Sequence, residues 1–311
     1  MIQQNELSKE PLTKEQIESC RHKSEKRWYR FMVFLNMILI VGVIAACVIH
    51  IPQYKKTVEQ KMKGNQEKFI EEVANELFSE NYMEGKVPTE LKLFVTGMFI
   101  LFLIPFILYF YYAKLRINGV RITEKNFPDV HQRIVEYSWR LGLKEVPKAY
   151  VVQQSGVLNA FSSFVVKKQY IQINSELFEI AYREHKDMDA LDFIIGHELS
   201  HIRYAHATFH YNLPIWFVMG IPIIGTTASR AREYSCDRLS QLLTGSRGID
   251  AMFALIVDRH LYKSVDLDAY LEDAAQEKGF FVWLNNLLST HPVMTKRIKA
   301  LVDRYGSGKL Y

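Results

Sequence analysis

Two histidines and a glutamate near the middle of the chain form an H-E-x-x-H motif, as His197, Glu198 and His201. They lie in a stretch, residues 187–210, whose apolar residues recur at helical spacing. Side chains one helical turn apart point from the same face, so the two imidazoles can bind one metal ion. Glu198 flanks the pair and can reach a water molecule on that metal. The pattern predicts a hydrolytic metal centre; the alternative is an amphipathic helix with two solvated histidines.

A third ligand is expected downstream, because a catalytic zinc ion takes three protein ligands and keeps one position open. Glu233 is the candidate, in a second helical stretch that stops at Gly245. Asp237 lies on the same helix face and can accept a hydrogen bond from the outer nitrogen of a ligating histidine. Without the histidine motif, these carboxylates would be a solvated acidic pair among arginines. We therefore predict one zinc ion per chain, bound by the two histidines and Glu233.

The residues around the two motifs narrow the class of site. The longer metzincin signature requires Gly and His where this chain has Tyr204 and Ala207, so that class is excluded. His206 is one residue out of place for the signature and is expected to be peripheral. Cys236, between the two carboxylates, is expected to be a small core residue rather than a thiolate ligand.

The composition excludes other function classes. The chain has 311 residues and a formal net charge of +5, without the basic stripe of a nucleic-acid-binding protein. Its three cysteines, Cys20, Cys47 and Cys236, are scattered and provide neither a disulfide framework nor a C-x-x-C site. The absence of a disulfide framework fits a reducing compartment for the soluble part. The modest charge gives no reason to expect a nucleic-acid partner.

Two uncharged segments, 31–51 and 93–113, are each long enough to cross a hydrocarbon core of roughly 30 Å. Basic residues flank their outer ends, whereas the loop between them, 52–92, has more glutamates than lysines. The positive-inside rule then predicts a multi-pass protein of the cell membrane with an extracytoplasmic loop. The N-terminal tail, 1–30, is polar and expected to be flexible. The tail and the catalytic domain, 114–311, are placed in the cytoplasm. A soluble helical hairpin is the alternative.

A third apolar run, 211–229, follows the histidine motif. A single crossing there would place the histidines and Glu233 on opposite sides of the membrane, and the run is too short to cross twice. We therefore expect an apolar hairpin beside the active site, buried or associated with the membrane surface. It would act either as a lid over the groove or as ordinary core.

The rest of the soluble part predicts a mainly helical α+β domain. Residues 127–141 are expected to form a helix with Pro128 near its start. Three β-rich runs follow, at 149–153, 157–166 and 169–173, and the last two are predicted to form a hairpin. We expect a small antiparallel β-sheet packed near the helix that carries the histidines.

Several motifs together resemble one family of enzymes. The chain is similar to the membrane zinc metallopeptidases that include the HtpX heat-shock protease and the CAAX prenyl endopeptidases, and resembles HtpX most. The shared motifs are H-E-L-S-H at 197–201, R-E-Y-S-C-D at 232–237, S-T-H-P-x-x-x-x-R-I at 289–298 and N-A-F at 159–161. The resemblance covers roughly 115–303 and implies a zincin-type (gluzincin) fold behind two transmembrane helices. It also implies that Glu233 is the third zinc ligand.

The resemblance implies further roles outside the zinc motifs. It places Asn159, Ala160 and Phe161 on an edge strand beside the cleft, where an extended substrate backbone can pair with it. It places His291 and Arg297 near the zinc ion, where either side chain can stabilise the transition state or hold the fold together.

Together these features predict a membrane-anchored zinc metalloendopeptidase, in which zinc activates water and Glu198 is the general base. Main-chain recognition suits membrane-protein quality control, with unfolded or membrane proteins as substrates. One alternative is an endopeptidase for one defined substrate, such as a prenylated tail or a peptide precursor. The other is a proteolytically inactive membrane adaptor. The sequence does not determine the oligomeric state.

Overall fold

The protein divides into two compact units in the computed structural model. One unit comprises Met1–Met32 and Tyr109–Tyr311, and the other comprises Val33–Leu108. The structure describes residues 10–62, 71, 75, 89–153, 159–165, 168–183, 185–303 and 308–311.

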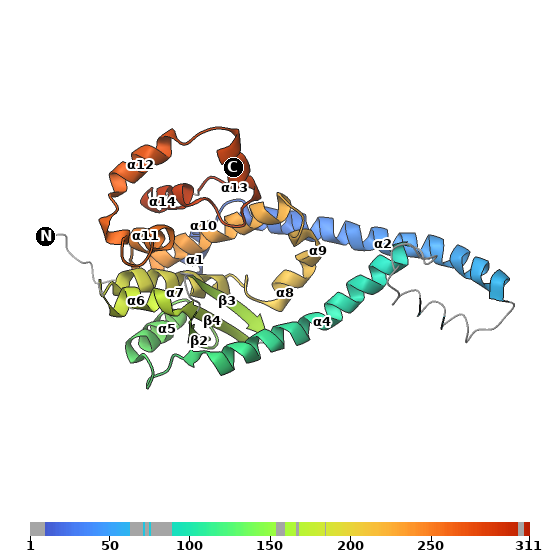
Figure 1. Cartoon of the computed structure of the whole chain (residues 1–311), viewed down its shortest axis with the longest axis horizontal. Helices are drawn as coiled ribbons and strands as arrows, with labels where there is room; N and C mark the ends of the chain where they lie inside the picture. The colour runs from blue at the N-terminus through green and yellow to red at the C-terminus, as the bar shows by residue number, and fades with distance from the viewer. Residues whose placement is uncertain are drawn as a thin grey trace. The chain divides into compact units, whose positions relative to one another are not determined.

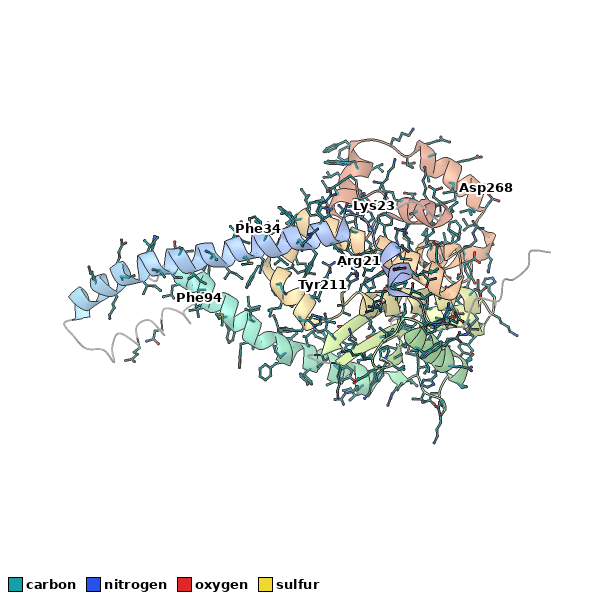
Figure 2. All side chains as sticks on the ribbon, turned by 180° about the vertical axis from the view of Figure 1, so that it is seen from behind. Arg21, Lys23, Phe34, Phe94, Tyr211 and Asp268 are labelled. Atoms are coloured by element: carbon teal, nitrogen blue, oxygen red, sulfur yellow. The ribbon has the colours of Figure 1, made fainter. Side chains whose placement is uncertain are left out.

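Two long helices contain the apolar segments: α2 spans Glu25–Met62 and α4 spans Thr89–Asn118. Each is long and apolar enough to cross a membrane, and each contains one of the two expected spans. Large side chains such as Phe34 and Phe94 are exposed along them (Figure 2). Such exposure is unfavourable in water and favourable in hydrocarbon. α2 continues beyond the expected span, and most of the expected loop 52–92 lies outside the described residues.

The N-terminal segment is part of the folded domain. Helix α1 spans Lys14–Ser19, and its Ile17 belongs to the main hydrophobic core, as does Cys20. The expectation of a loose tail over 1–30 is therefore wrong for residues 10–30. The buried residues of this polar stretch are Ile17, Cys20, His22 and Glu25, and such a scattered mixture of apolar and polar residues gives no periodic pattern.

A four-stranded sheet forms one layer of the domain, in the order β1-β2-β4-β3 (Figure 1). β3 and β4 pair antiparallel, as the predicted hairpin requires, but β2 and β4 pair in parallel. The sheet is therefore mixed, and the expectation of an antiparallel sheet is wrong at its centre. The chain reaches β4 by way of β3, and this crossover turns β4 in the same direction as β2 and leaves β3 at the edge. The strands are β1 Val120–Arg121, β2 Lys148–Val152, β3 Ala160–Val165 and β4 Lys168–Asn174.

Helix α7 (Met188–Arg203) lies at the centre of the domain, against α10 (Ile224–Thr244) and β3 (Figure 1). Asp187 caps α7 by accepting a hydrogen bond from the Ala190 N–H at 3.0 Å. Most of α7 is buried, including the first histidine and the glutamate of the motif. The other helices of the domain are α5 Pro128–Arg140, α6 Ser175–Tyr182, α11 Ile249–Val257, α12 Leu267–Gln276, α13 Phe280–Leu288 and α14 Met294–Val302, with a short 3-10 turn at Tyr262–Ser264.

Helix α7 ends earlier than the expected stretch 187–210. Ala205 has φ of 66°, a left-handed conformation that stops the helix and redirects the chain. The next residue, His206, is thereby turned inward and is buried. The expectation that His206 is peripheral is wrong, because the periodicity of the stretch does not reveal this break.

The apolar run 211–229 is compact and mostly helical. It contains the end of α8 (Phe209–Asn212), a 3-10 turn at Leu213–Ile215, α9 (Trp216–Met219) and the first turns of α10. Ile215 and Val218 are buried, so part of the run is ordinary core. Among the described residues that line the cavity at the histidine motif, none comes from this run. The cavity walls therefore give no support to a lid.

α7 and α10 pack closely at Gly196. A Cβ atom there would lie 2.6 Å from Ser240 Oγ and 2.8 Å from Thr244 Cγ2. We expect Gly196→Ala to lower the free energy of unfolding by about 1–3 kcal/mol, because the two helices must move apart. Thermal melting of the detergent-solubilised protein measures this, with Gly220→Ala as the matched control, since its nearest atom is 3.9 Å away. Equal stability of the two variants would show that the helices do not depend on this contact.

Candidate active site

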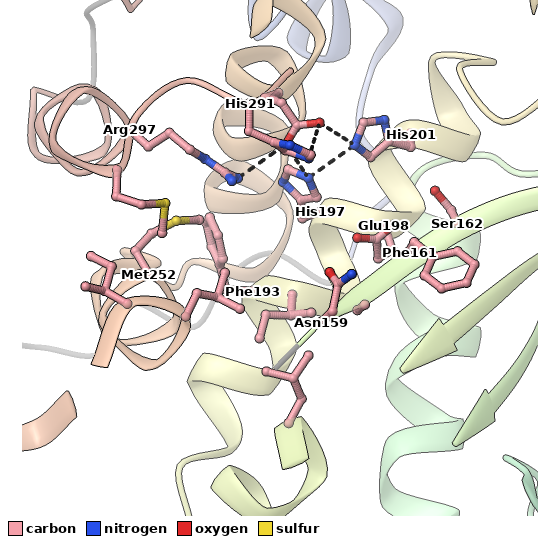
Figure 3. A pocket seen from close by; sticks show the side chains of 17 residues that line it. Asn159, Phe161, Ser162, Phe193, His197, Glu198, His201, Met252, His291 and Arg297 are labelled. Atoms are coloured by element: carbon pink, nitrogen blue, oxygen red, sulfur yellow. Dashed lines mark hydrogen bonds and ion pairs between the residues drawn. The ribbon is translucent and has the colours of Figure 1, made fainter. Parts of the chain in front are cut away.

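Three side chains from α7 and α10 converge on one point (Figure 3). His197 Nε2 and His201 Nε2 are 3.2 Å apart. Each lies 3.4 Å from a carboxylate oxygen of Glu233. The one-turn spacing places both imidazoles on the same face of α7, and the packing of α10 against that face supplies the carboxylate. Sequence reasoning grouped the same three residues.

The donor atoms of this group fit a tetrahedral zinc ion. Zinc–nitrogen and zinc–oxygen bonds of about 2.0–2.1 Å hold neighbouring donor atoms roughly 3.3 Å apart. The two Nε2 atoms are 3.2 Å apart, close to that edge length, and each lies 3.4 Å from a different oxygen of Glu233, Oε2 for His197 and Oε1 for His201, so the carboxylate faces both imidazoles. The set of two imidazoles and one carboxylate leaves a fourth position for water or substrate, as catalytic zinc sites require.

Asp237 supports one ligand and is in turn held by Arg297. Asp237 Oδ1 accepts a hydrogen bond from His197 Nδ1 at 2.8 Å, which fixes the ring orientation of that histidine. Arg297 donates to both Asp237 oxygens, at 2.9 and 2.6 Å, and also lies 3.6 Å from Glu233. Burial alone would raise the pKa of Asp237, but the charge of Arg297 and the hydrogen bond from His197 lower it. Asp237 is therefore an ionised acceptor.

From the sequence, His291 and Arg297 could each stabilise the transition state or hold the fold together. The structure places the two residues in different environments. Arg297 is buried at the wall of the same cavity, and its guanidinium group is engaged by the bidentate pair with Asp237. His291 is exposed and its Nε2 lies 3.7 Å from Glu233 Oε1, at the mouth of the site. The helix that follows, α14, begins at Met294. The geometry favours a structural role for Arg297 and leaves His291 accessible to substrate.

A cavity of about 600 Å³ opens beside the three ligands. Glu198, Asn159 and Phe161 line it together with His291 (Figure 3). β3 is an edge strand of the sheet among the described residues and begins at Ala160, so the edge predicted to bind substrate borders the same cavity as Glu198. The opposite wall is apolar and is formed by Leu177, Phe193, Met252, Leu255, Ile256 and Met294.

Behind the ligands, His206 lies against His201, and Cys236 lies against His206. His201 Nδ1 and His206 Nδ1 are 3.1 Å apart, and Cys236 Sγ is 3.8 Å from His206 Nδ1. Burial lowers the pKa of His206 to about 3 despite its hydrogen bond with Glu25, so the imidazole is neutral. Burial and the surrounding carboxylates, Glu233 first, raise the pKa of the Cys236 thiol well above its usual value. Cys236 is thus a protonated core residue, as predicted, and all three cysteines are free.

Comparison with known proteins identifies the class. The model of Peptidase family M48 matches residues 124–221 and 212–305, which together span more than half of the chain. The chain therefore belongs to Peptidase family M48, the family of HtpX and the CAAX prenyl protease, and the predicted family is confirmed. Membership makes it a metallopeptidase. Searches of curated proteins and of solved structures found no significant match.

Arg297 should be essential for stability. Replacing it by methionine leaves Asp237 and Glu233 without their buried cation, and loss of one partner from a buried ion pair costs about 3–5 kcal/mol. We expect Arg297→Met to lower the free energy of unfolding by that amount. The measurement is thermal or denaturant unfolding in detergent. Lys299→Met, an exposed position on the same helix, is the control and should change little. A normal melting temperature for Arg297→Met would contradict the assigned role.

Proposed function

We propose that the protein is a membrane-anchored zinc endopeptidase that cleaves peptide bonds with Glu198 as general base. The observation that carries this proposal is the cluster of His197, His201 and Glu233, whose donor atoms all lie within 4.8 Å of one another at the wall of the cavity that Glu198 lines. Membership in Peptidase family M48 supports it independently.

The cleavage follows from the positions of the chain's own groups. An extended substrate would add to the free edge of β3 at Ala160 and Phe161, with main-chain hydrogen bonds that do not select a sequence. When bound, zinc supplies Lewis-acid activation of water and of the scissile carbonyl group. Glu198 takes the proton of the attacking water and delivers it to the leaving amine. His291 lies at the mouth of the site, where its imidazole can donate to the developing oxyanion.

The substrates we propose are unfolded or membrane proteins. The edge strand recognises backbone, and the apolar wall of the cavity suits the hydrophobic side chains that such substrates expose. An endopeptidase for one prenylated tail or peptide precursor is the second candidate. The same apolar wall favours it, because a lipid chain or an apolar residue would fit there.

Glu198→Gln should abolish cleavage without loss of the metal. The amide keeps the size of the side chain but cannot take a proton, and general-base catalysis contributes about 10²–10⁴-fold to the rate. We expect hydrolysis of unfolded casein to fall by that factor while about one zinc ion per chain is retained. Glu124→Gln, an exposed position, is the control. Zinc with no casein cleavage in the parent would favour the single-substrate enzyme, and absence of zinc in the parent would favour the inactive adaptor.

The proposed location is the cell membrane, with the catalytic domain and the N-terminus in the cytoplasm. Two helices long and apolar enough to span a bilayer, with basic residues at their outer ends, support this arrangement. Labelling of introduced cysteines tests it, because the native Cys20, Cys47 and Cys236 are buried.

We expect a membrane-impermeant maleimide to label Ser79→Cys on intact cells, because the loop between the spans would face outward. Asp268→Cys, an exposed position on α12, should be labelled only after the membrane is permeabilised (Figure 2). The reverse pattern would invert the topology, and equal labelling of both in intact cells would argue against two crossings.

A further inference from the structure

The two histidines of the candidate zinc site have different supports. His197 donates directly to a carboxylate, that of Asp237. The outer nitrogen of His201 faces the buried His206 instead, with 3.1 Å between their Nδ1 atoms. The far nitrogen of His206, Nε2, lies 3.2 Å from Glu25 Oε1. His206 and Glu25 are 6% and 2% exposed, so solvent does not compete for these hydrogen bonds.

The direction of the hydrogen bonds follows from the metal-facing atom. His201 Nε2 points at Glu233 and His197, so it is the atom that would bind zinc, and Nδ1 of the neutral ring carries the proton. That proton is donated to Nδ1 of His206. A neutral imidazole has one donor and one acceptor, so Nε2 of His206 then donates to Glu25. Nδ1 of His206 therefore accepts from His201, with the Cys236 sulfur at a longer 3.8 Å from the same atom, and the series of hydrogen bonds ends on a carboxylate.

Glu25 is held in place from two sides. Its carboxylate accepts hydrogen bonds from the hydroxyl of Ser235 and from the guanidinium group of Arg21. Burial would raise its pKa, but the hydrogen bond from His206 and the charge of Arg21 help to lower it to about 2. Ser235 belongs to α10, the helix of Glu233, so the Glu25 carboxylate is fixed relative to the third ligand.

The segment around Glu25 is anchored to the end of α7. The Arg21 guanidinium group lies 4.1 Å above the ring of Tyr204, and the Tyr204 hydroxyl donates to the Ile17 carbonyl at 2.7 Å. The backbone N–H of His22 donates to Ser235 at 2.8 Å. These contacts fix the N-terminal segment against both helices that supply the zinc ligands.

We propose that Glu25 and His206 form a relay that positions the zinc ligand His201, so that the N-terminal segment is a working part of the metal centre. Hydrogen bonds from ligating histidines to carboxylates fix the tautomer and raise the basicity of the ligand. Here the carboxylate acts through a second imidazole. The inference rests on the proposed zinc site and adds two positioning residues that lie outside the H-E-x-x-H motif.

A second metal ion is the competing explanation of the same atoms. His201, His206 and Cys236 also lie close enough to share an ion. This would require His201 to lose both ring protons in order to bridge two metals, and Cys236 to ionise although it is buried beside several carboxylates. The relay needs neither. Glu25 is not a member of that group and would accept from His206 Nε2 in either case, so a count of bound metal ions separates the two explanations.

Zinc affinity tests the relay in the full-length protein in detergent, by competition with a chromophoric chelator. We expect Glu25→Gln and His206→Asn each to bind zinc about 10- to 100-fold more weakly than the parent. The amide introduced by His206→Asn can still accept from His201 but is too short to reach Glu25. Glu15→Gln, an exposed carboxylate on α1, is the matched control and should bind like the parent. If Glu25→Gln fails to fold, the zinc affinity of His206→Asn alone tests the relay.

Cobalt spectra separate a positioning role from a general loss of stability. The visible absorption of Co²⁺ at the site reports ligand geometry, and we expect it to change in both variants but not in Glu15→Gln. The double variant should be no weaker in zinc affinity than the weaker single variant, because both act in one relay.

The outcomes distinguish this inference from the proposed function. Absence of zinc from the parent would overturn the zinc site and the relay with it. Parent-like zinc affinity and cobalt spectra in both variants would overturn the relay alone. Two metal ions per chain in the parent, reduced to one by Cys236→Ala, would replace the relay by a second metal site.

Discussion

The site depends on how the charge of two buried carboxylates is compensated. Glu233 and Asp237 lie one turn apart on α10, and both are almost completely buried. An uncompensated carboxylate in such a place costs several kcal/mol. Arg297 on α14 supplies a positive charge, His197 on α7 donates a hydrogen bond to Asp237, and a divalent ion between the ligands would supply the remaining positive charge. These interactions therefore bring α7, α10 and α14, which are distant in sequence, together at the site.

This requirement explains why the ligands lie on regular elements rather than on loops. α7 and α10 pack so closely that Gly196 has no room for a side chain, and Ser240 donates to the Phe193 carbonyl at 2.6 Å across the contact. Metal ligands must be held within fractions of an ångström, and such close helix packing provides that precision. The edge strand β3 contacts α7 as well, so the surface proposed to bind substrate and the ligands share one rigid support.

Local patterns in the sequence predicted the ligands, and contacts between distant residues account for most of what was missed. Helical spacing identifies His197, Glu198 and His201, and a second helical motif identifies Glu233, so all four residues could be predicted from the sequence. The parallel pairing of β2 with β4 depends on where the crossover passes, which no local pattern encodes. The same holds for the burial of residues 10–30 and for the break at Ala205 that turns the next residue inward. The position of Arg297 near the site was predicted, but its pairing with Asp237 required the fold.

The two histidine ligands are supported by carboxylates from different parts of the chain, and this difference decides which residues the catalytic unit must include. The carboxylate behind His197 lies within residues 212–305, inside the family match. The carboxylate behind His201 is Glu25, which lies outside both matched segments, in the first turn of the helix that continues into the first candidate span. A soluble fragment limited to the matched residues would keep every ligand but lose one of the two supports. The segment that leads to the membrane anchor is therefore joined to the metal centre by hydrogen bonds, and a complete catalytic unit includes it.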